Sequence, residues 1–390
     1  MRKHRSDRII GVLVILLLLV SLVVIYAVGP MRANYINAAY GEEVYGTNDF
    51  FFHQLVSVVM SVVAFFVAFR VPYEKVRKYS KYVIVAGLGA CALLALLAAV
   101  GSSLARCQLG ACRWFNLGGL GSFQPAELLK LGLVLYLAQL VAERKKEGKI
   151  GKSDFWVPIV VVGGLSFILV VLAQKDFGTG AVLLAIILSI ILVSGVDLKV
   201  FGLIIAGTAV ACVLAVVTSP HRMERMMTYL GGDGADTYHI ENALIAIGTG
   251  GLGGVGVGNS VQATGYLPES INDSVFAIMG ETFGFIGLMG VVLCFAGILT
   301  RILKIAGTAE NDEQSFIAVG MFAWVMAHLA LNIMAMTGIL PLTGITLPLL
   351  SYGGTSMIFI AVGLGLCLQI SCYTGREEAT RKGIVKGARR

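Results

Sequence analysis

Asp273 lies where a polar loop meets a long apolar segment, in the stretch GYLPESINDSVFAIMGETFGFIG that covers residues 265–287. A carboxylate at a membrane boundary is unfavourable unless it is paired or has a function. Partial desolvation there raises a carboxylate pKa toward the values that suit a general base. The other interpretation is a helix N-cap, for which Asn272, Asp273 and Ser274 are all suitable residue types. Asp273 is therefore a candidate catalytic base or a cap, and one residue can do both.

Three charged residues earlier in the chain form a second candidate group. Glu127 and Lys130 are three positions apart, close enough to pair on one face of a helix that would begin near Pro125. As a pair they would only neutralise each other. If they face a cavity instead, Lys130 and Arg113 would supply the positive charge that binds a diphosphate. Both alternatives are compatible with the residues.

Asp176 and Glu281 are two further acids at the boundaries of apolar segments. Asp176, in QKDFGTG, is a candidate substrate-binding residue and equally a candidate cap for the apolar helix that follows. Glu281 follows Asp273 by about two helical turns on a similar face, so it should point into the protein interior. We expect both acids to support the site around Asp273, where Glu281, like Asp176, is a candidate substrate-binding residue.

A glycine run, GTGGLGGVGVG at 248–258, contains the pattern G-x-G-x-x-G at Gly248, Gly250 and Gly253. In dinucleotide-binding proteins this pattern follows a strand within a β-α-β unit, and the surrounding sequence predicts no such unit. Glycines also allow two chain segments to approach each other closely. We therefore interpret the run as a tight backbone turn.

The elements that must position these residues are membrane helices. Of the 390 residues, 57% are hydrophobic and only 14% are charged, and the mean hydropathy is +0.84. A helix that spans the bilayer needs about 20 apolar residues. The first apolar run follows basic residues but is too long for a signal peptide, so we expect a retained helix. The composition predicts an all-α polytopic membrane protein of about ten spans, near 9–28, 51–70, 82–101, 122–142, 156–173, 178–195, 200–218, 275–300, 315–336 and 352–371.

The positions of lysine and arginine predict the orientation, because positively charged loops stay in the cytoplasm. With the N-terminus inside, 23 of the 30 basic residues fall in inner segments, six in outer segments and one, Lys130, within a span. The predicted topology therefore explains the net positive charge of the chain, and this charge indicates no nucleic-acid partner. The sequence predicts a single membrane domain, 1–390, with a cytoplasmic N-terminus (1–8), a large outer loop between the seventh and eighth spans (219–274) and a basic cytoplasmic tail (372–390).

The cysteines and histidines indicate little further chemistry. Five of the seven cysteines lie in or beside spans, where cysteine usually acts as a small apolar residue. Cys107 and Cys112 lie in an outer loop, where an oxidising compartment permits a disulfide; two free thiols are the alternative. The five histidines have no metal-ligand spacing, so the sequence predicts no metal site.

Four separated segments carry a family resemblance: RWFNLGGLGSFQPAELLKL (113–131), QKDFGTG (174–180), ALIAIGTGGLGGVGVGNSVQATGYLPESINDSVFAIMGETFGFIG (243–287) and NIMAMTGILPLTGITLPLLSYGGTS (332–356). In these segments the sequence resembles the SEDS family (shape, elongation, division and sporulation), whose members FtsW and RodA polymerise peptidoglycan glycan strands from lipid II. Within them, NSVQATGYLPE and GITLPLLSYGGTS are closer to the division branch of the family, FtsW, than to the elongation branch, RodA.

The resemblance implies a glycosyltransferase that joins lipid II on the outer face of the cytoplasmic membrane, during septal cell-wall synthesis. It places Asp273 at the position of the family's proposed catalytic aspartate, and it places the block of Arg113, Glu127 and Lys130 along a central outer-facing cavity. It also implies a partnership with a single-span class B penicillin-binding protein, an FtsI-like transpeptidase, and with other cell-division proteins. A divalent cation, Mg²⁺ or Mn²⁺, beside Asp273 is compatible with this chemistry, but no ligand cluster requires one.

The sequence departs from the family pattern near the site. The usual QPDLGT reads QKDFGTG, so Lys175 replaces a proline, and the usual tyrosine-glutamine pair reads Tyr238 and His239. The usual His-Thr-Asp triplet reads Ile271, Asn272 and Asp273. Because Asp273 itself matches, the expected activity is unchanged, and the departures concern the detailed geometry of the site.

Three other functions are compatible with the sequence. A lipid II flippase or other transporter would also have many spans and buried charges, although we find no internal repeat of the kind that transporters show. A non-catalytic scaffold would equally explain the spans and the resemblance. An elongation role of the RodA type is the third. Activity on lipid II separates the enzyme from the first two.

Overall fold

The computed structural model describes residues 6–108, 110–118, 121–218, 220–229, 231 and 235–373. The predicted N-terminal segment and basic tail therefore lie largely outside the described residues. The elements in chain order are α1 (Arg8–Tyr40), α2 (Asp49–Arg70), α3 (Tyr73–Ala99), β1 (Ala105–Gln108), β2 (Ala111–Asn116), β3 (Ser122–Phe123), α4 (Pro125–Lys146), α5 (Ser153–Phe167), the π-helical turn η2 (Ile168–Ala173), α6 (Phe177–Ser194), α7 (Leu198–Val217), α8 (Pro220–Tyr229), α9 (Ala235–Thr249), the 3₁₀ turn η3 (Gln262–Thr264), α10 (Val275–Thr308), α11 (Asp312–Met336) and α12 (Gly354–Ile370).

Within the described residues, nine helices are long and apolar enough to cross a membrane, with α5 and η2 counted as one. The tenth predicted span corresponds to α12, which is apolar but has only 17 residues. At 1.5 Å per residue α12 is about 26 Å long, slightly short of a typical hydrocarbon core of about 30 Å. The polytopic all-α architecture is confirmed, with nine full-length spans and one shorter helix that packs against α2.

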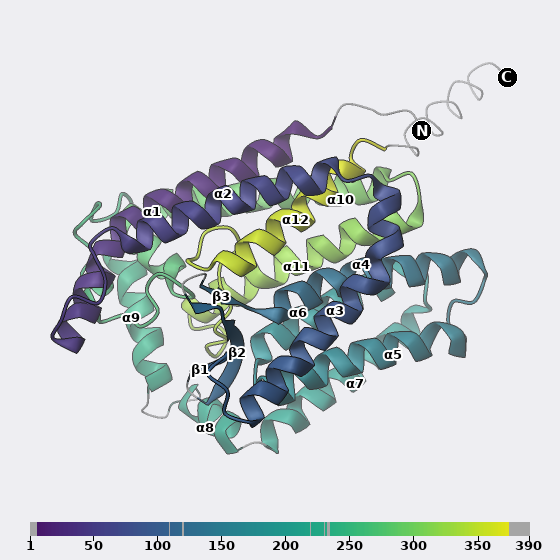
Figure 1. The fold of residues 1–390 in the computed structure, drawn as a ribbon, viewed down its shortest axis with the longest axis horizontal. Coiled ribbons are helices and arrows are strands. Elements are labelled where there is room, and N and C mark those ends of the chain that lie inside the picture. The colour runs from purple at the N-terminus through teal and green to yellow at the C-terminus, as the bar shows by residue number, and fades with distance from the viewer. Residues whose placement is uncertain are drawn as a thin grey trace.

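The helices run roughly parallel, and the elements of the predicted outer loops lie together at one end of the bundle (Figure 1). The strands, α8 and α9 lie at that end, whereas the α2–α3, α4–α5 and α10–α11 connections lie at the other (Figure 1). The start of α1 and the end of α12 meet at the second end, where the backbone N–H of Asp7 donates to the hydroxyl of Ser371 (2.9 Å). Asp7 also pairs with Arg301 of α10 (2.5 Å). Both ends of the described chain therefore lie on the same side.

Two glycines bring α3 and α4 into backbone contact. A Cβ on Gly87 would lie 2.8 Å from Cα of Leu129, and a Cβ on Gly132 would lie 2.8 Å from Cα of Ile84. Helices in a membrane associate by close packing, and small residues permit the closest approach. This contact fixes α4, which carries Glu127 and Lys130, in the middle of the protein.

The segment between α3 and α4 is a small three-stranded antiparallel sheet in the order β1-β2-β3. The sequence analysis predicted only helices and loops here, because the strands are short and lie between two strongly apolar runs. Cys107 and Cys112 are cross-strand partners joined by a disulfide, so the structure has the first of the two predicted alternatives. The sheet positions Arg113, one of the predicted site residues, because β2 carries it.

The glycine run at 248–258 packs against a break in α10. Gly284 leaves the helical conformation (φ 66°, ψ −169°), which deprives nearby backbone groups of their helical partners. The glycine run supplies replacements: Val255 N–H donates to Glu281 O (2.9 Å), and Phe285 N–H donates to Gly251 O (2.9 Å). A side chain on Gly250 would collide with α10, since its Cβ would lie 1.9 Å from Gly280 O. The prediction of a close backbone approach is confirmed.

Candidate functional site

Asp273 lies at the N-terminal end of α10, two residues before the helix begins. The side chain is half-buried, and its Oδ1 atom is buried without a hydrogen-bond partner among the described residues. The N-cap of α10 is Ser274, whose side chain accepts no capping hydrogen bond. The N-cap position is therefore occupied by Ser274 and not by Asp273, and a catalytic role of Asp273 remains a prediction.

The surroundings of Asp273 raise the pKa of its carboxyl above the ordinary value of 3.8. Burial raises the pKa of its carboxyl to about 7, and the negative charge of Glu269 adds to the rise. Backbone N–H groups and the guanidinium of Arg113 act in the opposite direction but are outweighed. A base whose pKa lies near the working pH combines a populated ionised form with useful basicity. Asp273 has the electrostatic properties of a general base.

Arg113 reaches the same region from β2. Its Nη2 donates to the backbone carbonyl of Lys175 (2.9 Å), and its Nε lies 3.8 Å from Oδ2 of Asp176. Asp176 is itself held as the N-cap of α6, because its two oxygens accept from the N–H (3.0 Å) and hydroxyl (2.9 Å) of Thr179. The predicted cap is confirmed, and it also aligns the guanidinium. Substrate contact by Arg113 or Asp176 remains a prediction.

Gly344 brings Arg113 and Asp273 into one space. It lies in the loop between α11 and α12 with φ of 67°, a left-handed conformation that glycine adopts without strain. A Cβ at this position would lie 3.7 Å from Nη1 of Arg113 and 3.9 Å from Oδ2 of Asp273. The backbone at Gly344 therefore lies beside both a cation and a carboxylate, and any side chain longer than a methyl group here would extend toward these two groups.

Lys130 and Glu127 lie deeper in the bundle. Nζ of Lys130 donates to Oε1 of Glu127 (2.8 Å) and lies 2.9 Å from Nε2 of His328 and 5.1 Å from the ring centroid of Trp324. Both side chains of the ion pair are buried. The structure therefore has the pairing that was one alternative for these residues. Diphosphate binding by Lys130 remains a prediction.

Glu281 has a role in holding the outer loop. Its carboxylate accepts from the hydroxyl of Ser260 (2.5 Å) and from the backbone N–H groups of Val261 (2.9 Å) and Gln262 (3.2 Å). The side chain is buried, as predicted from its spacing to Asp273. Its hydrogen bonds fix the turn at η3, and a substrate contact by Glu281 remains a prediction.

No metal site accompanies these residues. The part of the chain that the structure describes contains no group of three His, Cys, Asp or Glu side chains that could hold a metal ion. The requirement for Mg²⁺ or Mn²⁺ remains a prediction.

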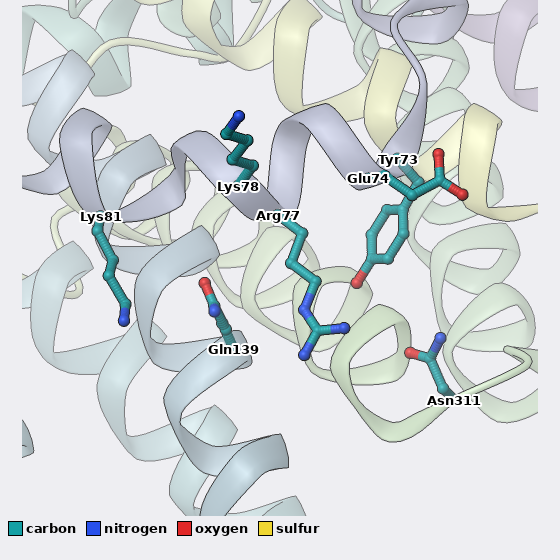
Figure 2. A pocket seen from close by; sticks show the side chains of 7 residues that line it. All are labelled: Tyr73, Glu74, Arg77, Lys78, Lys81, Gln139 and Asn311. Carbon is teal, nitrogen blue, oxygen red and sulfur yellow. The ribbon is translucent and has the colours of Figure 1, made fainter.

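A cavity of about 410 Å³ lies at the opposite end of the bundle, beside the inner ends of α3, α4 and α11. Figure 2 shows Arg77 and Lys81 extending from α3 toward Gln139, while Lys78 points away from them. Arg77 is matched by carboxylates, with Nε 3.2 Å from Glu313 and Nη2 3.7 Å from Glu143. This cavity contains none of the predicted site residues, and its charged contacts join three helices.

Comparison with known proteins identifies the family. A family model described as "Cell cycle protein" (FtsW/RodA/SpoVE) matches residues 7–376. The chain belongs to this family. Among curated relatives, it is 33% identical to stage V sporulation protein E of Bacillus subtilis (strain 168), over 96% of this chain and 99% of that protein. It is 35% identical to the probable peptidoglycan glycosyltransferase FtsW of Escherichia coli O6:H1, over 88% of this chain and 82% of that protein.

Solved structures have the same fold as this member of the FtsW/RodA/SpoVE family. One chain, from the structure titled "Structural coordination of polymerization and crosslinking by a peptidoglycan synthase complex", matches with a TM-score of 0.71 and 24% identity, covering 94% of this chain and 97% of its own. The rod shape determining protein RodA of Thermus thermophilus matches with a TM-score of 0.67 and 22% identity, covering 95% and 98%. The SEDS resemblance and the multi-pass membrane fold are thereby confirmed.

Lys175 shows how this family member accommodates a departure from the family pattern. It adopts φ of 53°, whereas proline is restricted to about −65°. The backbone before α6 therefore has a conformation here that a proline could not take. This turn presents the Lys175 carbonyl to Arg113, so the substitution bears directly on how the guanidinium is oriented.

Sequence reasoning missed two polar residues of α11 that contact the site. His328 lies beside Lys130, and its Nδ1 lies 3.2 Å from the carbonyl of Thr346. Asn332, one helical turn further, donates to the carbonyls of Asp273 and Ile345 (2.7 Å each). Two polar residues four apart in an apolar helix share one face and usually have a function. That spacing was the available signal.

Proposed function

We propose that this protein is a peptidoglycan glycosyltransferase that polymerises lipid II during septal wall synthesis. The single observation that carries the proposal is the Asp273 carboxylate, which has one buried oxygen without a partner among the described residues and lies, like the guanidinium of Arg113, beside Gly344. Family membership and the curated names of the relatives supply the substrate class. The arrangement combines a base and a cation at the outer end of a membrane bundle, where a lipid-linked sugar diphosphate would be presented.

Each group has a defined part in the transfer. Asp273 accepts the proton of a sugar hydroxyl as that oxygen attacks the anomeric carbon of a second, lipid-linked sugar. The bond from that carbon to the diphosphate oxygen breaks, and the lipid diphosphate leaves with the electron pair. Arg113 lies close enough to Asp273 for its positive charge to stabilise the developing negative charge on the leaving group. Asp176 and the Lys175 carbonyl hold the guanidinium in place.

The proposed setting is the outer face of the cytoplasmic membrane. The asymmetry of basic residues, 23 inner against six outer, supports cytoplasmic termini. The structurally similar chain from a peptidoglycan synthase complex supports a partnership with a class B penicillin-binding protein, whose transpeptidase would cross-link the glycan product. Within this proposal the chain also works with other cell-division proteins.

The test is polymerisation of lipid II by the purified protein with its cognate penicillin-binding partner, whose transpeptidase is blocked. Asp273→Asn keeps the shape of the side chain but removes the proton-accepting carboxylate. We expect it to reach the membrane, bind the partner and polymerise roughly 100-fold or more slowly, the scale on which general-base removal acts. Asp49→Asn, the same chemical change at the start of α2, is the matched control and should polymerise at the wild-type rate.

The outcomes separate the alternatives. Equal polymer yield from wild type and Asp273→Asn would reject Asp273 as the base. No polymer from the wild type, with lipid II instead moved across vesicles, would favour a transporter. The break of α10 at Gly284 is the one observation that favours this second function, because transporters often bind substrate at discontinuous helices. The glycine run satisfies the backbone at that break, which is consistent with a rigid element.

A further inference from the structure

Asn332 holds two loops together beneath the candidate site. Its side chain is buried, and Nδ2 donates both of its hydrogens, to the carbonyl of Asp273 (2.7 Å) and to the carbonyl of Ile345 (2.7 Å). One loop precedes α10 and carries the proposed base. The other joins α11 to α12 and carries Gly344, which borders both charged groups. A single amide therefore links the backbone on both sides of the proposed reaction space.

The direct links between these two loops are few. Among the described residues, a second one is the hydrogen bond from Tyr352 N–H to Ile271 O (2.8 Å), on the far side of Asp273. The Asp273 loop is also held by Ser274, which donates to the Pro268 carbonyl (2.8 Å) and lies 2.7 Å from Nε2 of His239. Loss of Asn332 would thus leave both loops anchored but would release the contact nearest the carboxylate.

We propose that Asn332 is a positioning residue that sets the distance between Asp273 and Arg113 by clamping the Asp273 loop to the Gly344 loop. This inference rests on the proposed glycosyltransferase function and adds a residue that never touches substrate. The clamp works through backbone carbonyls, so it requires an amide donor at this position. An acceptor would face two carbonyl oxygens and push both loops away.

The clamp at Asn332 also controls how much water reaches the Asp273 carboxylate. The charged groups that act on Asp273 are Arg113 from β2 and Glu269 from its own loop, while burial has the largest effect on its pKa. When the two loops separate, water reaches the carboxylate and its pKa falls toward the ordinary value. Displacement of the carboxylate also lowers the rate of proton transfer, since a shift of about 1 Å can reduce a rate by about 100-fold.

The test compares Asn332→Ala and Asn332→Asp with the wild type in lipid II polymerisation across pH. We expect kcat to fall roughly 10-fold or more for alanine and further for aspartate, with little change in KM. The midpoint of the acidic limb of the rate profile should move to lower pH in the alanine variant. Thr337→Ala is the matched control, because its hydroxyl bonds only carbonyls of its own helix, those of Ile333 (2.8 Å) and Met334 (3.4 Å).

A rate that falls with an unchanged midpoint would show a loss of folded enzyme only and would overturn the proposal. So would wild-type kcat in both variants. Hydrogen exchange gives a second measurement that needs no activity: amides at 269–274 and 344–347 should exchange faster in Asn332→Ala than in Thr337→Ala. If the wild type makes no polymer, the proposed function fails, and unchanged exchange in these two segments would then reject the clamp independently.

Discussion

Nε of Arg113 lies 3.8 Å from Oδ2 of Asp176, while Nη2 of the same guanidinium donates to the backbone carbonyl of Lys175 (2.9 Å). The two contacts use different edges of one planar group. They hold the guanidinium in a single orientation and leave Nη1 directed toward Gly344 and the proposed site. The position of this positive charge is thus set by the start of α6, far away in the sequence.

Replacing Arg113 by lysine should therefore impair activity although the charge is kept. A lysine has one ammonium and cannot bind Asp176, Lys175 and a diphosphate at the same time. We expect kcat/KM for lipid II polymerisation to fall by roughly 10-fold to 100-fold, less than the loss of a whole electrostatic donor costs, because lysine keeps the charge. Arg106→Lys, the same change on neighbouring β1, is the matched control. Full activity of Arg113→Lys would show that orientation at this position is irrelevant.

The pH dependence of stability should report the buried charge of Asp273. Its folded pKa of about 7 is raised above the ordinary carboxyl value of 3.8, so the folded state holds its proton more tightly than the unfolded state. Stability from this group is complete below about pH 4 and is lost as pH rises through 7. Asp273→Asn carries no such charge, so its apparent Tm should exceed that of the wild type at about pH 8.

The check is thermal unfolding of both proteins in the same detergent at several pH values. The difference in Tm should shrink as the pH falls toward 4, where both side chains are neutral. Asp49→Asn measured in parallel corrects for general effects of removing a carboxylate. A constant difference across the whole range would contradict a pKa near 7 for Asp273. In the activity assay, the wild-type rate should rise with pH through the same region, because a base must be ionised.

Glu281→Gln should loosen the outer loop at η3. Glutamine keeps one acceptor oxygen but presents an NH₂ group to N–H donors, so the charge-assisted bonds from Ser260, Val261 and Gln262 are lost or weakened. We expect a loss of about 2 kcal/mol in stability. The measurement is the apparent Tm together with proteolysis of the 250–270 segment, and Glu310→Gln, an exposed acid at the inner end of α10, serves as the control. Unchanged proteolysis would contradict the loop-holding role.

Much of the fold could be predicted because membrane spans are local features of sequence. The apolar runs that form α1 and α2 are read directly from composition, since a helix in lipid satisfies its own backbone hydrogen bonds. Asp273 could also be singled out locally, as a carboxylate at the start of an apolar run. The strands β1 and β2 could not, because strand pairing depends on a distant partner and short strands carry a weak pattern.

The sequence by itself determined the polytopic all-α class, the family and the identity of the candidate base, because each depends on residue type and local spacing. Only the tertiary structure decided which groups meet. Arg113 from β2, Gly344 from the last outer loop and Asn332 from α11 converge on Asp273 through side-chain contacts between elements far apart in the chain. Such contacts follow from helix packing and loop geometry, and the local pattern of residue types along the chain does not predict them.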